Sequence, residues 1–115
     1  MLAPSAFPFR YIAPGVLAGK LPTDESDVYS FGICCWEVFT REYAYYHMDP
    51  RDIAAGVIRG ELRPTITDGI PRPLAEIMRE CWALNPLRRP DFAELAQRLA
   101  AMEQGPLVRH RADRA

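Results

Sequence analysis

The sequence has few of the features that mark secreted, metal-binding, membrane or nucleic-acid-binding proteins. It has only three cysteines in 115 residues, without metal-ligand or disulfide-framework spacing, so reduced thiols and a cytoplasmic location are expected. Its two histidines, His47 and His110, have no partner pattern, so no metal site is expected. The net charge of −1 gives no reason to expect nucleic acid or an anionic membrane as partner. The first ten residues lack a basic region followed by a long apolar run, so no signal peptide is expected, and no apolar run is long enough to predict a membrane span.

What the sequence does contain is apolar residues, 49% of a chain long enough for one small domain. The most apolar stretch, residues 27–40, predicts a helix with apolar side chains on nearly every side. Such a helix is expected to be buried, with the other helices packed around it. Thr23 is expected to cap its N-terminus, followed by Asp24 and Glu25 in the first turn.

Four further helices are predicted from helix-capping and helix-breaking residues and from the periodicity of apolar residues. A short helix begins at Pro14 and is stopped by Gly19. A second helix, residues 50–59, is capped by Asp49 and ended by Gly60. A third, residues 74–82, has apolar residues at i, i+3, i+4, i+7 and i+8. Asp91 caps the last helix, whose expected apolar face is Phe92, Leu95, Ala96 and Leu99.

These patterns define the expected domain organisation. Residues 1–10 are expected to be extended or loose, and residues 11–103 to form an all-α domain around the central helix. Prolines interrupt residues 61–73, and no strand is expected there. Residues 104–115 predict a disordered basic tail, with a docking role for its arginines as the alternative.

Three motifs together resemble one family. Ala13-Pro14-Gly15 resembles the Ala-Pro-Glu segment that closes a protein kinase activation segment. The run from Asp27 to Ile33, followed by Trp36-Glu37, resembles the buried central helix of the kinase C-lobe. The spacing from Trp82 to Arg89-Pro90 resembles the turn before the last C-lobe helix. The resemblance covers residues 7–102 and implies the C-terminal half of a protein kinase-like C-lobe.

Within this family, the resemblance leaves the phosphoacceptor open. Pro8, Phe9 and Arg10 resemble the substrate loop of tyrosine kinases. Tyr11 and the Arg63-Pro64 pair are more similar to serine/threonine kinases. Taken together, the motifs are most similar to those of tyrosine kinases and the tyrosine-kinase-like group.

The motifs that perform phosphate chemistry in this family are absent from the sequence. It has no G-x-G-x-x-G loop, no V-A-I-K-like strand, no H-R-D and no D-F-G. No catalytic residue is therefore expected, and ATP and Mg²⁺ are expected only for a full-length relative. Three interpretations follow: a partial kinase domain that is inactive alone, a non-catalytic interaction module, or a kinase whose first part lies upstream. The expected partner is another protein or the missing N-terminal kinase portion.

The resemblance also implies roles for single residues. In the family, the glutamate at position 15 pairs with the arginine at position 89, but here position 15 is Gly15. Arg89 is thus expected to be solvated or to pair with another acid such as Glu80, because an uncompensated buried charge costs about 3–5 kcal/mol. Asp27 corresponds to an aspartate that binds the catalytic loop, and here it is expected to face solvent. Pro8, Phe9 and Arg10 are expected to be disordered.

For the remaining candidate residues, packing in the core is the alternative to a functional role. Trp36 and Trp82 are expected in the core, and Cys34 and Cys35 as buried, unreactive thiols. The helix 50–59 resembles a docking helix, for which a partner site or core packing would explain the apolar residues Ile53, Val57 and Ile58. If the chain is complete, part of residues 28–39 is expected to be an exposed apolar patch, and the fold to be marginally stable.

Overall fold

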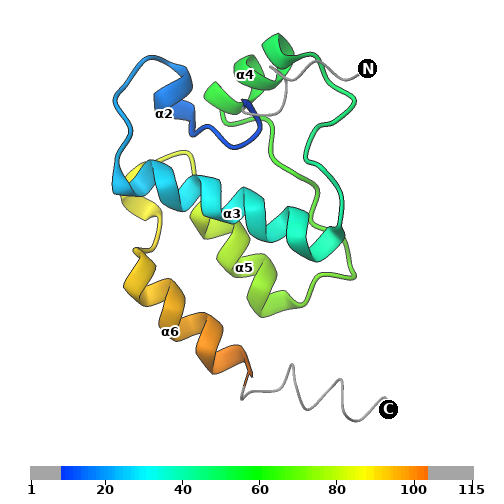
Figure 1. Cartoon of the computed structure of the whole chain (residues 1–115), viewed down its shortest axis with the longest axis vertical. Coiled ribbons are helices and arrows are strands. Elements are labelled where there is room, and N and C mark those ends of the chain that lie inside the picture. Colours follow the sequence, from blue (N-terminus) through cyan, green and yellow to red (C-terminus); the bar gives the residue numbers. More distant parts are fainter. Residues whose placement is uncertain (1–8, 104–115) are drawn as a thin grey trace.

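The computed structural model describes residues 9–103, and its regular structure is entirely helical (Figure 1). No strand occurs in this part of the chain, which confirms the all-α prediction. Nor does this part hold a helix both long enough and apolar enough to cross a membrane. The elements are α2 (Pro14–Leu17), α3 (Asp24–Thr40), α4 (Pro50–Ile58), α5 (Arg72–Cys81), the 3-10 helix η1 (Pro86–Arg88) and α6 (Phe92–Glu103).

The central helix α3 begins with the cap that the sequence predicts. The Thr23 hydroxyl accepts a hydrogen bond from the Ser26 backbone N–H at 3.1 Å. The Ser26 hydroxyl accepts one from the Thr23 backbone N–H at 2.8 Å, which completes a capping box. The helix ends after Thr40, where Arg41 adopts the left-handed conformation with φ of 60°. The helix therefore starts directly after the predicted cap, with Asp24 and Glu25 in its first turn, and ends at the predicted residue.

Only one face of α3 is buried, so the expectation of burial on all sides is wrong. The buried face consists of Ser26, Val28, Tyr29, Gly32, Ile33 and Trp36. On the other side, Val38 is 78% exposed, Phe39 is 43% exposed and Cys34 is also exposed. The reason is that the buried face packs against α5 (Figure 1), whereas Cys34, Val38 and Phe39 belong to neither of the two apolar clusters described below. Part of the range 28–39 is thus exposed apolar surface, as expected.

Two apolar clusters hold the helices together. In the main cluster, Tyr29, Ile33 and Trp36 of α3 pack with Met78 of α5 and with Trp82. The second cluster joins α6 to this pair of helices and consists of Val28, Ile77, Cys81 and Leu95. Beside it the rings of Phe31 and Phe92 meet edge to face, with centroids 5.8 Å apart. Trp36 and Trp82 are therefore core residues.

Helix α4 packs on the α2 side of the molecule (Figure 1). Asp49 caps α4, its carboxylate accepting a hydrogen bond from the Arg51 backbone N–H at 2.8 Å. Ile53 and Val57 are 2% and 1% exposed and point into the main cluster. This packing leaves α4 with little apolar surface for a partner.

Candidate functional site

The first charged site joins the segment before α2 to the C-terminal half of α3. The Arg10 Nε donates to Glu37 Oε2 at 2.6 Å, and the side chains are only 7% and 10% exposed. The expectation that residues 1–10 are loose, and that Arg10 is disordered, is therefore wrong at this residue. A nearly buried carboxylate on α3 needs a cation beside it, because an isolated buried charge is very unfavourable.

Tyr11 and Ala44 complete the coordination of the Glu37 carboxylate. The Tyr11 hydroxyl donates to Oε1 at 2.5 Å, and the Ala44 backbone N–H donates to Oε2 at 2.7 Å. Arg10 Nη2 donates to the Tyr11 hydroxyl at 2.6 Å. Burial, together with the adjacent Glu37 carboxylate, raises the pKa of Tyr11 to about 12. Tyr11 therefore stays protonated at neutral pH, and the cluster is a static clamp rather than an acid–base pair.

The clamp orders the residues that resemble a substrate loop. Phe9 packs against the main apolar cluster, and the ring of Tyr43 lies 4.8 Å from the Arg10 guanidinium carbon. Pro8 lies outside the described residues. The sequence motif included Glu37 beside Trp36, but it did not indicate which residues Glu37 contacts. The available signal was its position: apart from Asp27 at the start of the apolar run 27–40, Glu37 is the only carboxylate in that run, and a buried carboxylate requires a partner.

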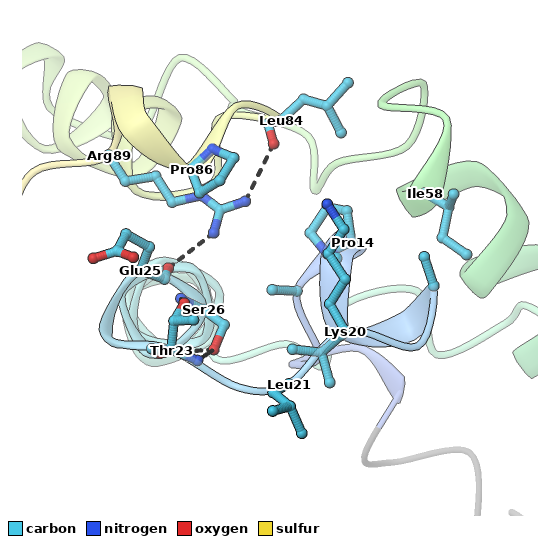
Figure 2. A pocket seen from close by; sticks show the side chains of 14 residues that line it. Pro14, Lys20, Leu21, Thr23, Glu25, Ser26, Ile58, Leu84, Pro86 and Arg89 are labelled. Atoms are coloured by element: carbon cyan, nitrogen blue, oxygen red, sulfur yellow. Dashed lines mark hydrogen bonds between the residues drawn. The ribbon is translucent and has the colours of Figure 1, made fainter.

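The second charged site is the turn after α5, where Arg89 bonds to three backbone carbonyls. Its Nε donates to Ala83 O at 2.9 Å. Its Nη1 donates to Glu25 O at 2.9 Å and its Nη2 to Leu84 O at 3.4 Å, the two bonds drawn in Figure 2. None of the ion pairs among residues 9–103 involves Arg89. Backbone carbonyls therefore take the place of the second acid that was expected as a partner of Arg89, and its side chain is half-buried rather than fully solvated.

Glu80, the alternative acid for Arg89, has a different partner. Its two carboxylate oxygens accept hydrogen bonds from Arg98 of α6 at 2.7 and 2.8 Å. The hydrogen bond from Arg98 lowers the pKa of Glu80. Glu80 therefore ties α5 to α6, and the suggestion that it neutralises Arg89 is wrong.

The Arg89 turn lies against the base of α3, as the resemblance implies. The guanidinium carbons of Arg63 and Arg89 lie 5.2 and 5.3 Å from the centroid of the Tyr29 ring, which is fully buried. Pro90 is buried beside Arg89. On the opposite side of a cavity of about 330 Å³ lie Pro14 and Gly15.

Three remaining candidates have simpler positions. Asp27 is exposed, as expected. In α4, burial excludes Ile53 and Val57 from a docking surface, whereas Ile58 is 38% exposed. Core packing is thus the correct interpretation for the first two residues.

The cysteines differ from one another in exposure. Cys34 is exposed, which corrects the expectation that it is buried, because it lies on the side of α3 away from α5. Cys35 is half-buried, and burial raises its pKa to about 11. Burial raises the pKa of Cys81 to about 12. None of these thiols is activated as a nucleophile at neutral pH.

The described residues do not fit a complex of ATP with Mg²⁺. Residues 9–103 contain no group of three or more His, Cys, Asp or Glu side chains that could hold a metal ion. The Arg63 guanidinium already donates to backbone carbonyls, among them Trp82 O at 2.8 Å. No step through ATP can therefore be assigned to these residues. His110 and the basic segment 104–115 lie outside the described part of the chain.

Comparison with known proteins agrees with this architecture. The family model for "Protein tyrosine and serine/threonine kinase" matches residues 2–99. The chain therefore belongs to the protein tyrosine and serine/threonine kinase family. Over 95 residues it is 40% identical to mitogen-activated protein kinase kinase kinase 11 of Homo sapiens. It is 38% identical over 90 residues to dual specificity protein kinase shkA of Dictyostelium discoideum, and 37% identical over 91 residues to serine/threonine-protein kinase STY46 of Arabidopsis thaliana.

These matches cover most of this chain and little of the relatives. The three alignments span 83%, 77% and 79% of this chain, but only 11%, 17% and 16% of the respective relatives. The shared region is thus the helical segment described above.

Proposed function

We propose that this chain is the C-terminal helical part of an ATP-dependent protein kinase domain, and that the isolated chain neither binds Mg-ATP nor transfers phosphate. The observation that carries the proposal is the contrast between two parts of the machinery. The Arg10–Glu37 clamp holds the substrate-loop-like segment in place. The sequence contains none of the motifs that hold ATP, Mg²⁺ or the attacking hydroxyl.

The scaffold residues support this division of labour. Phosphoryl transfer depends mostly on positioning and on stabilising charge in the transition state. The described arginines Arg10 and Arg63 donate to Glu37 and to backbone carbonyls, so they stabilise the fold rather than a phosphate. A cytoplasmic location belongs to the same proposal, supported by the free thiols of Cys34, Cys35 and Cys81.

A titration of the 115-residue chain with ATP, with and without Mg²⁺, tests the proposal. We expect no saturable heat signal up to millimolar ATP, and no transfer of labelled phosphate to a serine/threonine or a tyrosine substrate. An intact, active protein kinase serves as the positive control. Saturable, Mg²⁺-dependent ATP binding by the isolated chain would overturn the proposal.

A second candidate function is a non-catalytic interaction module, favoured by the apolar surface near the end of α3. Val38, Phe39, Tyr43 and Tyr46 are exposed there, and Phe39, Tyr43 and Tyr46 line a cavity of about 560 Å³. The partner would be another protein or an N-terminal kinase portion.

Mixing the chain with a separate polypeptide that carries the G-x-G-x-x-G, H-R-D and D-F-G motifs separates the two candidates. Phosphotransfer by the mixture would support the kinase-domain proposal. Association without phosphotransfer would support the interaction module.

A further inference from the structure

The cavity between α2 and the Arg89 turn has the charge and shape of a small anion site. Its volume, about 330 Å³, is at the lower end of the ~300–1,000 Å³ typical of small-molecule sites. Figure 2 shows Arg89 on the α3 side, and Pro14 and Lys20 on the opposite side. Two cationic side chains therefore face one cavity. The one acid that lines it, Glu25, has its carboxylate turned away from the cavity in this view.

The Arg89 guanidinium has unused donors at this cavity. A guanidinium has five N–H groups, and Arg89 donates three hydrogen bonds, all to carbonyl oxygens. One N–H on Nη1 and one on Nη2 thus have no acceptor among residues 9–103. These two nitrogens are the pair that binds a carboxylate through two parallel hydrogen bonds. Burial lowers the pKa of Arg89, as expected for a cation whose charge is poorly compensated.

The opposite wall has room for a ligand. A Cβ built on Gly15 would meet only one atom within 4 Å outside the local chain, Lys20 Cδ at 3.5 Å. The remaining wall is partly apolar, formed by Pro14, Ile58 and Leu84. Ile58 and Leu84 are 38% and 49% exposed, so a short alkyl chain could cover them.

We propose that this cavity is a binding site for a short aliphatic carboxylate, whose carboxylate group bridges Arg89 and Lys20 and whose alkyl chain contacts Ile58 and Leu84. The apolar wall favours an organic acid over inorganic phosphate. Phosphate is strongly hydrated and has no alkyl chain to place against Ile58 and Leu84. A ligand of this size with one bidentate contact is expected to bind with a dissociation constant of roughly 1–10 mM.

Thermal unfolding of the full chain in sodium butanoate tests the site. At about ten times the dissociation constant, butanoate should raise the unfolding temperature by about 5–10 °C. Sodium chloride at equal ionic strength and the neutral isostere butanamide should give much smaller shifts. In an NMR titration with butanoate, the chemical shift of the Arg89 Nε–H should change, and the fitted dissociation constant should equal that from thermal unfolding.

Two variants of Gly15 locate the effect without touching Arg89. Gly15→Glu places a carboxylate inside the cavity, so it should raise the unfolding temperature without ligand and abolish the response to butanoate. Gly15→Gln has nearly the same volume without charge, so it should abolish the response without a comparable rise.

Three results would overturn the assignment. One is a response to butanoate no larger than that to sodium chloride. Another is a Gly15→Glu chain that responds to butanoate as the wild type does. The third is an equal response to inorganic phosphate, which would show a general anion effect instead of a carboxylate site.

Discussion

Gly32 of α3 lies directly against Cys81 of α5. A Cβ built on Gly32 would stand 2.6 Å from the Cys81 Cβ, and 3.6 Å from the Met78 carbonyl oxygen. Real Cβ atoms essentially never approach so closely, and both atoms belong to packed helix. The close crossing of α3 and α5 therefore depends on the missing side chain at position 32.

Gly32→Ala should destabilise the domain. The added methyl must push α3 and α5 apart, at about 1–3 kcal/mol, which exceeds the ~1 kcal/mol that alanine gains over glycine in a helix. Urea unfolding followed by circular dichroism measures the difference. Gly69→Ala is the matched control, because a Cβ there meets nothing within 4 Å. Equal midpoints for the two variants would refute the close-contact argument.

Glu37→Gln should remove the counter-charge of the clamp. Arg10 is 6% exposed, so losing the carboxylate of a buried pair should cost about 3–5 kcal/mol of unfolding free energy. Glu61→Gln is the control, because the ion pair of Glu61 with Arg59 is solvent-exposed. The Arg59 side chain is 60% exposed and the Glu61 side chain 68%, so this pair should contribute about 0–1 kcal/mol to the unfolding free energy. Chemical denaturation compares the two. A loss for Glu37→Gln as small as that for Glu61→Gln would show that the clamp contributes little.

Because of Tyr11, the unfolding free energy should depend on pH in the alkaline range. Its folded-state pKa, about 12, lies above the ordinary value of 10.0, so folding favours the protonated phenol. This contribution is fully present below pH 10 and is lost as the pH rises from 10 towards 12. The unfolding free energy of Tyr11→Phe should therefore fall less steeply than that of the wild type across this interval. Parallel profiles for the two proteins would exclude a Tyr11 contribution.

The three thiols should react in order of exposure. Iodoacetamide should modify Cys34 first in the native protein, Cys35 more slowly, and Cys81 only after unfolding. All should react more slowly than free cysteine near pH 7, because burial raises the pKa of each thiol. Peptide mass spectrometry at successive times measures the order, and urea-unfolded protein is the control. Early labelling of Cys81 would indicate that α5 opens readily from the core.

Substitutions in α4 should distinguish a side chain that packs in the core from one that lies at the surface. Ile53→Ala removes a side chain that is 2% exposed and should cost about 2–5 kcal/mol. Ile58→Ala, on the same helix but 38% exposed, should cost clearly less. Thermal unfolding of both variants gives the comparison. Equal losses would mean that Ile58 is as well packed as Ile53, and that α4 offers no surface at all.

Local signals in the sequence were sufficient for the helices. Thr23 and Asp49 cap α3 and α4 as predicted, because a cap depends on residues three positions apart or fewer. The order of Pro14, Trp82 and Arg89 was sufficient for the family, which the match over residues 2–99 confirms. Both kinds of signal lie within short stretches of chain.

The partners of charged residues were not predictable in the same way. Arg10 and Glu37 are 27 positions apart, and Arg89 and Glu25 are 64 apart. Which groups meet over such separations depends on how α3, α5 and the turns pack, and no periodicity encodes it. The same limit explains Cys34, whose side of α3 became exposed because α5 covers only the other side.

By itself, then, the sequence determined the helical class, the N-terminal caps of α3 and α4 and membership in the kinase family, since these rest on neighbouring residues and ordered motifs. Only the tertiary structure decided that Arg10 is clamped by Glu37, that Glu80 binds Arg98, and that the Arg89 guanidinium faces a cavity beside Gly15. The physical reason is that burial and electrostatic pairing depend on distances between atoms remote in the chain, which exist only after the helices have packed.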